Sequence, residues 1–547
     1  MTSNSNKGFT IFETLIAMGI FSLVSLSIYF SYSNILDVIL SSQFGLSALS
    51  VYENEIEAIR NMPYKDVGIQ GGAPAGKLLA QKTVTQGGVS FTVKTTIRNV
   101  DDPFDGTIGG TPNDLAPADY RLVELEVSCV DCGQYAPVKV TTTVAPNNLE
   151  NSTKNGALFI NVLNASGQPV SQANISIVNN SVSPAININD VSNVNGSLQL
   201  VDIATSSAGY EITVSKSGYS SERTYIPGGV GNPNPVKSHA TVATQQLTNI
   251  SFAIDIVSTV NFKTTDFMCL AVPNIDFQQT GSKLIGTEPD VLKYSGSGVT
   301  DVSGNKMITN LEWDTYNFQN LDPGYDISGK FTLAPFIVNP DSAYVFNWLM
   351  EAKQPLAALI TVQNQTGQKI NDAKITLVKT GFSAEQFTGQ RFISQTDWSA
   401  NQYDSQSGKI ETDNPTGRLA IESVGAKYAS MSQEWLISKT FDFGTASTAF
   451  FNLEWIPTSQ PIQTGLNSLK FQIAANNDNL TWNFLGPDGT GNTYYTTSNT
   501  LLNSLHNGNR YLRYKAYLFT EDENYTPSLD FVKIGFRSSC VPAGQTY

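Results

Sequence analysis

The pattern of apolar and polar positions changes character twice along this 547-residue chain. Apolar residues dominate positions 9–30, and at ~1.5 Å per residue such a helix crosses a hydrocarbon layer of ~30 Å. From residue 35 to residue 59 apolar side chains recur at three- and four-residue steps, which predicts an amphipathic continuation of the same helix. Pro63 ends the pattern, because proline lacks an amide proton and clashes with the preceding turn. We therefore expect one helix over residues 9–61 that spans a membrane once.

Beyond Pro63 the apolar positions alternate with polar ones, as they do in half-buried strands. Residues 89–95, 122–127 and 138–144 show this alternation, so residues 64–146 are expected to form a small β head on the amphipathic part of the helix. The chain is too long for one hydrophobic core, since single cores stop growing near ~250–300 residues. The predicted fold class is therefore a long N-terminal helix with an α+β head, followed by several all-β domains.

One acidic residue, Glu13, lies within the apolar segment, where a charge is costly and points to a function. A short basic leader that ends in Lys7-Gly8 precedes the apolar segment, which begins at Phe9. These residues resemble the class III signal of type IV prepilins and pseudopilins. The resemblance implies that residues 1–8 are a leader peptide and that a prepilin peptidase cuts between Gly8 and Phe9 and methylates the new terminus. It also implies that Glu13, the fifth mature residue, pairs with the terminal amine of a neighbouring subunit. The alternative is an uncleaved signal anchor.

The resemblance also implies a location and partners. We expect a single pass through the inner or cytoplasmic membrane with the C-terminal bulk outside, and then display at the cell surface or on a pilus. Other pilin subunits would bind through the helix. Many major pilins have a mid-helix proline where this chain has Phe30, and major pilins are much smaller. These departures favour a minor or terminal subunit.

An internal repeat with an offset of 200 residues follows a polar linker at residues 147–155. Each copy predicts a strand, a tight turn at a glycine and a second strand. The first copy resembles carboxypeptidase regulatory-like and collagen-adhesin B-type modules, which implies immunoglobulin-like sandwiches over residues 156–255 and 256–350, with Trp313 in the second core. A partial copy occupies residues 356–390. The matched positions are Ala157, Ile160, Val162, Asn164, Gly167, Gln168, Val170, Ala173, Ile175 and Val178, and Ala357, Ile360, Val362, Asn364, Gly367, Gln368, Ile370, Ala373, Ile375 and Val378.

Residues 391–547 are rich in aromatic side chains, and residues 511–518 alternate as strands do. They resemble the jelly-roll sandwiches of discoidin-like and carbohydrate-binding modules, which bind ligands through loops at their rim. Sugar rings stack on exposed aromatic side chains, and their hydroxyl groups pair with amides and guanidinium groups. The alternative is that the candidate residues belong to the core and turns of a sandwich. The predicted ligand-binding residues are Trp482, Tyr494, Tyr495 and Arg510, with Asn483 and Asn509 beside them.

Composition narrows the chemistry. A net charge of −14 argues against nucleic acid as a partner, because binding to a duplex relies on Lys and Arg. Only His239 and His506 are present, in unrelated segments, so a catalytic triad is not expected and we predict no enzyme. Cys129 and Cys132 could close a small disulfide, whereas Cys269 and Cys540 have no obvious partner in the sequence.

No cofactor is expected, with calcium as the one alternative. Asp101, Asp102 and Asp105 lie beside a glycine turn, and Asp119 follows. Carboxylate oxygens are ligands for calcium, and some pseudopilins bind calcium in this region. The spacing does not match an EF-hand, and Asp-Pro and Asp-Gly steps also form ordinary turns.

The function expected from these patterns is that of a minor or tip subunit of a type IV pilus-like filament. Its sandwiches would present the last domain for adhesion to a surface glycan or a cell-surface protein. One alternative is a structural pseudopilin of a secretion or DNA-uptake system. A second alternative is a surface glycosidase tethered by the helix, because a pair of carboxylates is not visible in a sequence.

Overall fold

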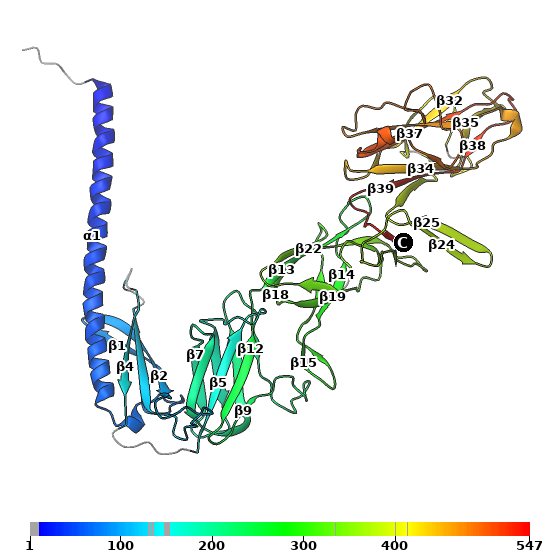
Figure 1. Cartoon of the computed structure of the whole chain (residues 1–547). Helices are drawn as coiled ribbons and strands as arrows, with labels where there is room; N and C mark the ends of the chain where they lie inside the picture. Colours follow the sequence, from blue (N-terminus) through cyan, green and yellow to red (C-terminus); the bar gives the residue numbers. More distant parts are fainter. Residues whose placement is uncertain are drawn as a thin grey trace, which may run out of the picture. The chain divides into compact units, whose positions relative to one another are not determined.

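The computed structural model describes residues 10–129, 132, 136–146, 154–333, 335–399, 401–412 and 414–547. The chain divides into two units, which are described separately. The first contains residues 1–256 and 284–291, and the second contains residues 257–283 and 292–547. One long helix is followed by β-sheets in both units, which confirms the predicted fold class (Figure 1).

Helix α1 (Ile11–Arg60) runs as one continuous element. Its first part exposes a large apolar surface all round, whereas its last four turns bury Ala48, Val51, Tyr52 and Ile59 against a sheet. The segment that begins at Ile11 is long and apolar enough to cross a membrane. This division matches the expected change from a membrane segment to an amphipathic one.

The sheet on the helix is an antiparallel meander in the order β1-β2-β3-β4 (Figure 1). Phe91, Val93, Val123 and Leu125 alternate toward the helix and are buried. The backbone N of Val127 donates a hydrogen bond of 3.1 Å to the hydroxyl of Tyr52. The elements are η1 (Tyr64–Asp66), β1 (Gln81–Gln86), β2 (Val89–Val100), β3 (Tyr120–Ser128) and β4 (Val138–Val144).

A sandwich of two sheets follows in the first unit. One sheet has the order β12-β5-β8, and the other has the order β10-β9-β6-β7 with β11 on β9. The two inner faces share one core, to which β5, β6 and β9 contribute Ile160, Ile175 and Ile212. The strands are β5 (Gly156–Leu163), β6 (Asn174–Asn179), β7 (Ile186–Val191), β8 (Ser197–Ile203), β9 (Ser206–Ser215), β10 (Glu222–Arg223), β11 (Ala240–Val242) and β12 (Leu247–Ala253).

The second unit begins with another sandwich, whose sheets have the orders β18-β13-β22-β20 and β17-β14-β19-β21. Stacked aromatic rings fill its core; Phe318 and Phe346, for example, have ring centroids 4.4 Å apart. The strands are β13 (Ser258–Thr265), β14 (Asp276–Gly281), β17 (Ser295–Val299), β18 (Asn305–Leu311), β19 (Asp314–Asn320), β20 (Tyr325–Lys330), β21 (Phe336–Val338) and β22 (Ala343–Ala352). Between β14 and β17 the chain forms a hairpin of β15 (Leu284–Gly286) and β16 (Val291–Leu292), whose residues 284–291 belong to the first unit.

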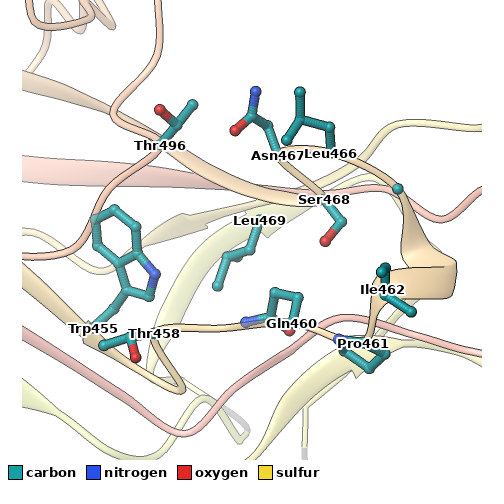
Figure 2. Close-up of a pocket in the computed structure, with 11 residues that line it drawn as sticks. Trp455, Thr458, Gln460, Pro461, Ile462, Leu466, Asn467, Ser468, Leu469 and Thr496 are labelled. Atoms are coloured by element: carbon teal, nitrogen blue, oxygen red, sulfur yellow. The ribbon is translucent and has the colours of Figure 1, made fainter.

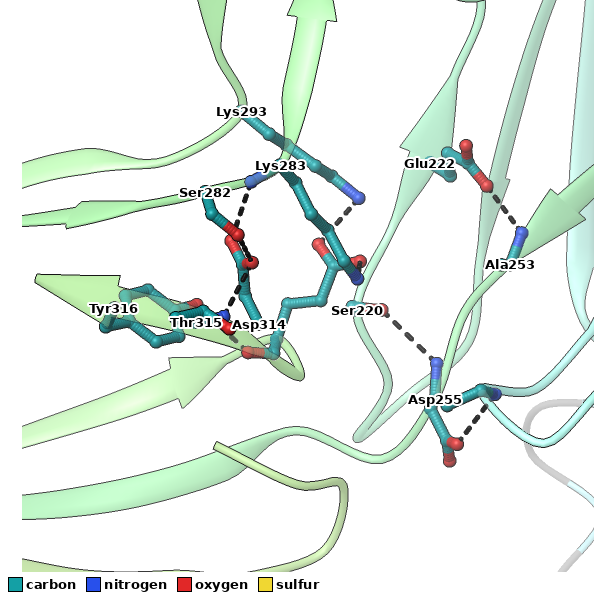
Figure 3. Close-up of polar contacts among 12 residues, drawn as sticks. Ser220, Glu222, Ala253, Asp255, Ser282, Lys283, Lys293, Asp314, Thr315 and Tyr316 are labelled. Atoms are coloured by element: carbon teal, nitrogen blue, oxygen red, sulfur yellow. Dashed lines mark hydrogen bonds and ion pairs between the residues drawn. The ribbon is translucent and has the colours of Figure 1, made fainter. Parts of the chain in front are cut away.

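Trp313 lies outside that core, so its predicted place was wrong. It is half-exposed, and the Nζ of Lys283 sits 3.3 Å from its ring centroid. Lys283 and Lys293, which are labelled in Figure 3, both form ion pairs with Glu312, at 2.7 and 2.6 Å. The neighbouring Leu311 and Tyr316 are the residues buried in the core. The indole of Trp313 instead lies at the surface, where its ring contacts the ammonium group of Lys283.

The partial repeat forms two small pieces. β23 (Ile360–Thr361) pairs with β40 (Gln545–Thr546), and β24 (Lys374–Lys379) pairs with β25 (Phe382–Phe387). Strands β24 and β25 form a hairpin (Figure 1). The chain between β25 and β40 builds the C-terminal sandwich.

The C-terminal sandwich has a sheet in the order β26-β39-β34-β36 and a sheet in the order β27-β32-β37-β33, with β35 on β37. A large core that includes Trp398, Phe443, Phe471 and Tyr514 lies between them. The elements are β26 (Arg391–Gln395), β27 (Tyr403–Gln406), β28 (Ile410–Glu411), β29 (Leu419–Ile421), β30 (Ser423–Val424), β31 (Lys427–Tyr428), β32 (Glu434–Ser438), β33 (Phe441–Asp442), β34 (Ala449–Ile456), η2 (Ile462–Thr464), β35 (Leu469–Asn476), β36 (Thr500–Leu501), η3 (Ser504–His506), β37 (Tyr511–Leu518), β38 (Ser528–Leu529) and β39 (Phe531–Arg537).

All four cysteines are in disulfides. Cys129 pairs with Cys132, as the sequence allowed. Cys269 pairs with Cys540, although the two are 271 residues apart in the sequence. Their pairing could not be foreseen, because it depends on the loop after β13 lying against the end of the C-terminal sandwich, where Phe267 and Phe536 have ring centroids 6.1 Å apart.

Candidate functional site

Strand β37 carries the most distinctive surface of the C-terminal sandwich. Its even-numbered side chains, among them Leu512 and Tyr514, are buried in the core. Its odd-numbered side chains, Arg513, Lys515 and Tyr517, are half-exposed on the other face of the sheet. The strand therefore presents an outer row of cationic and aromatic side chains.

Neighbouring strands and loops add to this row. Tyr517 lies opposite Trp435 of β32 and Lys470 of β35 in the sheet register. The loop after β35 adds Trp482 and Tyr494, and the rings of Tyr494 and Tyr517 meet edge to face at 5.1 Å. We call this surface the aromatic–cation face, and its members are Trp435, Lys470, Trp482, Tyr494, Arg513, Lys515 and Tyr517.

Cations and rings are in contact across the aromatic–cation face. The guanidinium carbon of Arg513 is 4.3 Å from the ring centroid of Trp482. The Nζ of Lys515 is 4.2 Å from the ring of Trp435, and the Nζ of Lys470 is 3.9 Å from the ring of Tyr494. These are distances at which a ring face attracts a cation, so the rings hold the ammonium groups at the sheet surface.

The charges on this face are unevenly balanced. Arg513 forms an ion pair of 2.8 Å with Asp404. In the part of the chain that the structure describes, no carboxylate forms an ion pair with Lys470 or Lys515. Partial burial lowers the pKa of both lysines and raises the pKa of Tyr517 to about 12. An anionic group bound beside the two lysines would offset the cost of burying their charges.

The structure separates the four predicted ligand-binding residues. Trp482 and Tyr494 belong to the aromatic–cation face. Tyr495 points into the core, with 1% of its surface exposed, and its hydroxyl accepts a hydrogen bond from the backbone N of Asn503. Arg510 is held by Asp442 through bonds of 2.7 and 2.9 Å.

The two flanking amides lie in loops outside the strands. Asn483 is exposed in the loop, and Asn509 donates to the backbone O of His506 at 3.0 Å. Sequence reasoning missed Trp435, Lys470, Arg513 and Lys515. The alternation in residues 511–518 was visible, but the pairing of β37 with β32 and β35 was not.

A separate pocket of about 350 Å³ lies between the end of β34 and the start of β35 (Figure 2). Its lining contains no charged residue, and its Gln460 side chain already donates to the backbone O of Ser528 at 2.9 Å. None of the predicted ligand-binding residues contributes to it. It therefore offers less for recognition than the aromatic–cation face.

The predicted assembly residue lies at the start of α1. Thr10 caps the helix, and its backbone N and hydroxyl each donate to the Glu13 carboxylate at 3.0 Å. The backbone N of Glu13 in turn donates to the Thr10 hydroxyl at 3.3 Å, so the two residues form a capping box. Gly8 and Phe9, the predicted processing residues, lie outside the described residues.

The acidic loop of the head is held by its own hydrogen bonds. The carboxylate of Asp101 accepts from the backbone N of Ile108 at 2.9 Å, and that of Asp119 accepts from the backbone N of Asp102. Asp105 is exposed at the turn. Within the described residues no group of three or more His, Cys, Asp or Glu side chains is arranged to hold a metal ion. Calcium binding here remains an untested prediction.

Asp101 supports a prediction for the head. Burial, and then the nearby Asp114, Asp119 and Asp105, raise the pKa of Asp101 from 3.8 to about 6. The folded state then holds its proton more tightly than the unfolded state, so this residue makes folding less favourable as pH rises from about 4 to 6. We expect Asp101→Asn to stabilise the head by about 1 kcal/mol at pH 7.5, after allowance for solvent screening, and to have no effect at pH 3.5.

The measurement is hydrogen exchange of β3 amides in both variants at the two pH values. Calcium should be added in a second series. If calcium protects β3 in the wild type and Asp101→Asn abolishes that protection, the loop is a calcium site and the asparagine will be destabilising in its presence.

His506 supports the opposite pH dependence in the second unit. Burial lowers its pKa from 6.5 to about 4. The unfolded chain then takes up a proton that the folded chain does not, so stability falls as pH drops from 6.5 to 4. We expect a loss of about 2 kcal/mol.

Tryptophan fluorescence measures this loss cleanly, because all six tryptophans lie in the second unit. His506→Phe should remove the pH dependence. A decline of the same size in that variant would assign it to other groups.

Comparison with solved structures gives low scores. A streptococcal ancillary pilin is 12% identical over 43% of this chain and 76% of its own, with a TM-score of 0.19. The Bacillus anthracis TIE protein is 12% identical over 57% of this chain and 67% of its own, with a TM-score of 0.16. GBS52, the minor pilin of Streptococcus agalactiae, is 11% identical over 37% of this chain and 99% of its own, with a TM-score of 0.17. Scores this low do not establish a common fold.

No curated protein matches the chain. Its amino-terminal segment does match a family model: residues 3–29 fit the prokaryotic N-terminal methylation motif. The matched segment contains Gly8, Phe9 and Glu13 and most of the apolar part of α1. The chain therefore carries a prepilin-type methylation signal at the head of a single long apolar helix, in front of a series of β domains.

Proposed function

We propose that this protein is a minor or tip subunit of a type IV pilus-like filament that presents its C-terminal sandwich for adhesion. The methylation motif and the apolar helix support assembly through the amino terminus. A prepilin peptidase would remove residues 1–8, and the helix would leave the membrane to pack among other pilin helices. Glu13 would then exchange its capping contact with Thr10 for the terminal amine of a neighbour.

The bulk of the extracytoplasmic part favours the tip. The domains beyond α1 run from the β head to residue 547, and a lattice in which many copies pack side by side would have to accommodate them all. A terminal position avoids this crowding. Detached filaments labelled with an antibody to residues 391–547 should show label at one end, and even labelling along the length would contradict a tip position.

The observation that carries the adhesion proposal is the pair of half-buried lysines, Lys470 and Lys515. Both lie against aromatic rings and form no ion pair with a carboxylate in the described part of the chain. A ligand with a flat apolar surface and a negative charge fits both features, since its ring can stack on Trp482 or Trp435 while its anion meets the ammonium groups. Acidic polysaccharides that contain uronate or sulfate have this chemistry.

The test uses the full chain in lipid nanodiscs on an array of acidic and neutral polysaccharides. We expect binding to the acidic members that weakens as salt rises. The double variant Lys470→Gln/Lys515→Gln should bind at least about tenfold more weakly, because each lost charge-assisted bond is worth ~1.5 kcal/mol or more. The matched control is Lys439→Gln, which removes an exposed lysine of the same sandwich whose Nζ donates to the side chain of Gln402 at 2.6 Å.

Each other result points elsewhere. If the double variant binds as well as the wild type, the aromatic–cation face is not the binding site for the polysaccharide. Cleavage of a bound polysaccharide would favour a tethered glycosidase. No binding to any member, with normal assembly, would favour a structural pseudopilin of a secretion or DNA-uptake system.

A further inference from the structure

The two copies of the internal repeat have matching hydrogen bonds. In the first copy, the backbone N of Ala173 donates to the hydroxyl of Ser192 at 2.9 Å, and that hydroxyl donates to the O of Val170 at 2.7 Å. In the second copy, Ala373 donates to the hydroxyl of Thr388 at 3.0 Å, and that hydroxyl donates to the O of Ile370 at 2.7 Å. The copies therefore share a fold in their first strands and turns.

The match continues at the next strand. The backbone N of Val162 donates to the O of Gly196 just before β8, and the N of Val362 donates to the O of Gly544 just before β40. The distances are 2.7 and 2.8 Å. Strand β40 therefore takes the place of β8, and the C-terminal sandwich is inserted into the second copy between Gly389 and Gly544.

The second copy has fewer strands than the first. In the first copy β6 is paired on both edges, with β7 on one side and β9 on the other. In the second copy, among the described residues, the equivalent strand β24 pairs with β25 alone. One edge of β24, the edge that corresponds to the β9 side of β6, is therefore open.

The side chains beside that edge are apolar and exposed. Ile177 of the first copy is fully buried, whereas Leu377 at the equivalent position is 59% exposed. The register of the β24–β25 hairpin places Ile375, Leu377, Ala384 and Phe382 on one face, with Gln386 opposite Ile375 and Lys379 opposite Phe382, and Phe382 is 53% exposed. In the first copy this face is the core of a sandwich.

Ordinary edge strands avoid pairing by carrying inward-pointing charges, a proline or a bulge. The face of β24 that would be interior carries Ile375 and Leu377 in its middle and a single charge, Lys379, at its end. Lys374 points to the opposite face, where it forms an ion pair of 2.7 Å with Glu385. The edge thus lacks the usual protection along its centre.

We propose that the open edge of β24 accepts an extended strand from a partner protein of different sequence, in the place that β9 takes in the first copy. In that copy Ile212 lies opposite Ile177 and Val214 lies opposite Ile175, with β9 antiparallel to β6. The incoming strand therefore runs antiparallel to β24 and has apolar side chains at alternate positions. It carries an acidic residue near its amino-terminal end, which lies beside Lys379.

This chain supplies its own probe, a peptide of residues 206–215, the sequence of β9. It is added to the full chain in detergent micelles, and hydrogen exchange is followed at residues 374–379. We expect the peptide to protect these amides. A peptide with Ser in place of Tyr210, Ile212 and Val214 should give no protection, because it has the backbone of β9 but not its apolar face.

Two variants with matched positions test the face. Leu377→Lys puts a charge on the apolar face and should weaken peptide binding by about 10- to 100-fold, the range expected when the burial of one leucine is lost. Thr376→Lys puts the same charge on the opposite face of the same strand and should bind the peptide as the wild type does. Both sites are exposed, so neither change removes a buried contact.

If the free peptide binds too weakly to give protection, a fusion of the peptide to the chain provides the test. Joining residues 206–215 to Tyr547 through a flexible linker raises the local concentration to about the millimolar range. Absence of protection in the fusion, or equal protection with Leu377→Lys, would overturn the proposal. A concentration-dependent dimer that Leu377→Lys abolishes would also overturn it, because the occupant would then be a second copy of this chain. These readouts need no filament and no polysaccharide, so they are independent of the proposed function.

Discussion

Glu13→Gln is expected to block incorporation into filaments as completely as Glu13→Ala. The glutamine can keep the capping box with Thr10, because an amide oxygen accepts the same bonds as the carboxylate. It cannot form an ion pair with the terminal amine of a neighbour, and the cost of leaving that amine unpaired among apolar helices is large. The measurement is the fraction of protein in sheared filaments relative to the membrane, where both variants should fall to background.

Two controls separate assembly from helix capping. Thr10→Ala removes the capping hydroxyl but keeps the carboxylate, and it should assemble normally. Removal of the leader must be intact in every variant, as judged by the loss of residues 1–8 from the mature protein. If Glu13→Gln assembles while Glu13→Ala does not, the role of Glu13 is to cap the helix, and the proposed ion pair is wrong.

The second large effect is expected from the disulfide between Cys269 and Cys540. It closes a loop of 271 residues, and the loss of chain entropy in the unfolded state grows with loop length. The double variant Cys269→Ser/Cys540→Ser should lower the free energy of unfolding of the second unit by about 3–5 kcal/mol. Urea unfolding followed by tryptophan fluorescence measures this, since the six tryptophans all lie in that unit.

The other disulfide is a matched control. Cys129 and Cys132 are three residues apart and belong to the first unit, so Cys129→Ser/Cys132→Ser should leave the fluorescence transition unchanged. An unchanged transition in the Cys269→Ser/Cys540→Ser variant would mean that the packing of Phe267 against the C-terminal core holds the two segments together without the covalent bond.

Local patterns in the sequence predicted the elements well and their partners poorly. The helix, its end near Pro63 and the alternation in β37 depend on neighbouring residues, and the structure confirms all three. Tyr494 and Tyr495 show the limit. Adjacent residues in an extended segment point in opposite directions, so one joins the aromatic–cation face and the other enters the core, and the sequence does not say which.

Long-range pairings were out of reach for the same reason. Cys269 and Cys540 meet only because a loop of one sandwich packs on another, and Lys470 meets Tyr517 only through the register of β35 with β37. The sequence did not reveal the insertion in the second repeat copy, because β40, the strand equivalent to β8, follows the whole C-terminal sandwich in the chain. Contacts of this kind depend on the order and pairing of strands that are far apart in the sequence, and a local pattern does not predict that pairing.

The insertion has a consequence for resistance to proteolysis. The chain enters the C-terminal sandwich before β26 and leaves it before β40, which pairs with β23, and the disulfide between Cys269 and Cys540 adds a second covalent link to the rest of the second unit. A protease that cuts the chain at residue 390 would leave the sandwich attached through the disulfide and through the pairing of β23 with β40. A domain at the end of a simple linker would be shed by the same cut, whereas this one would be retained.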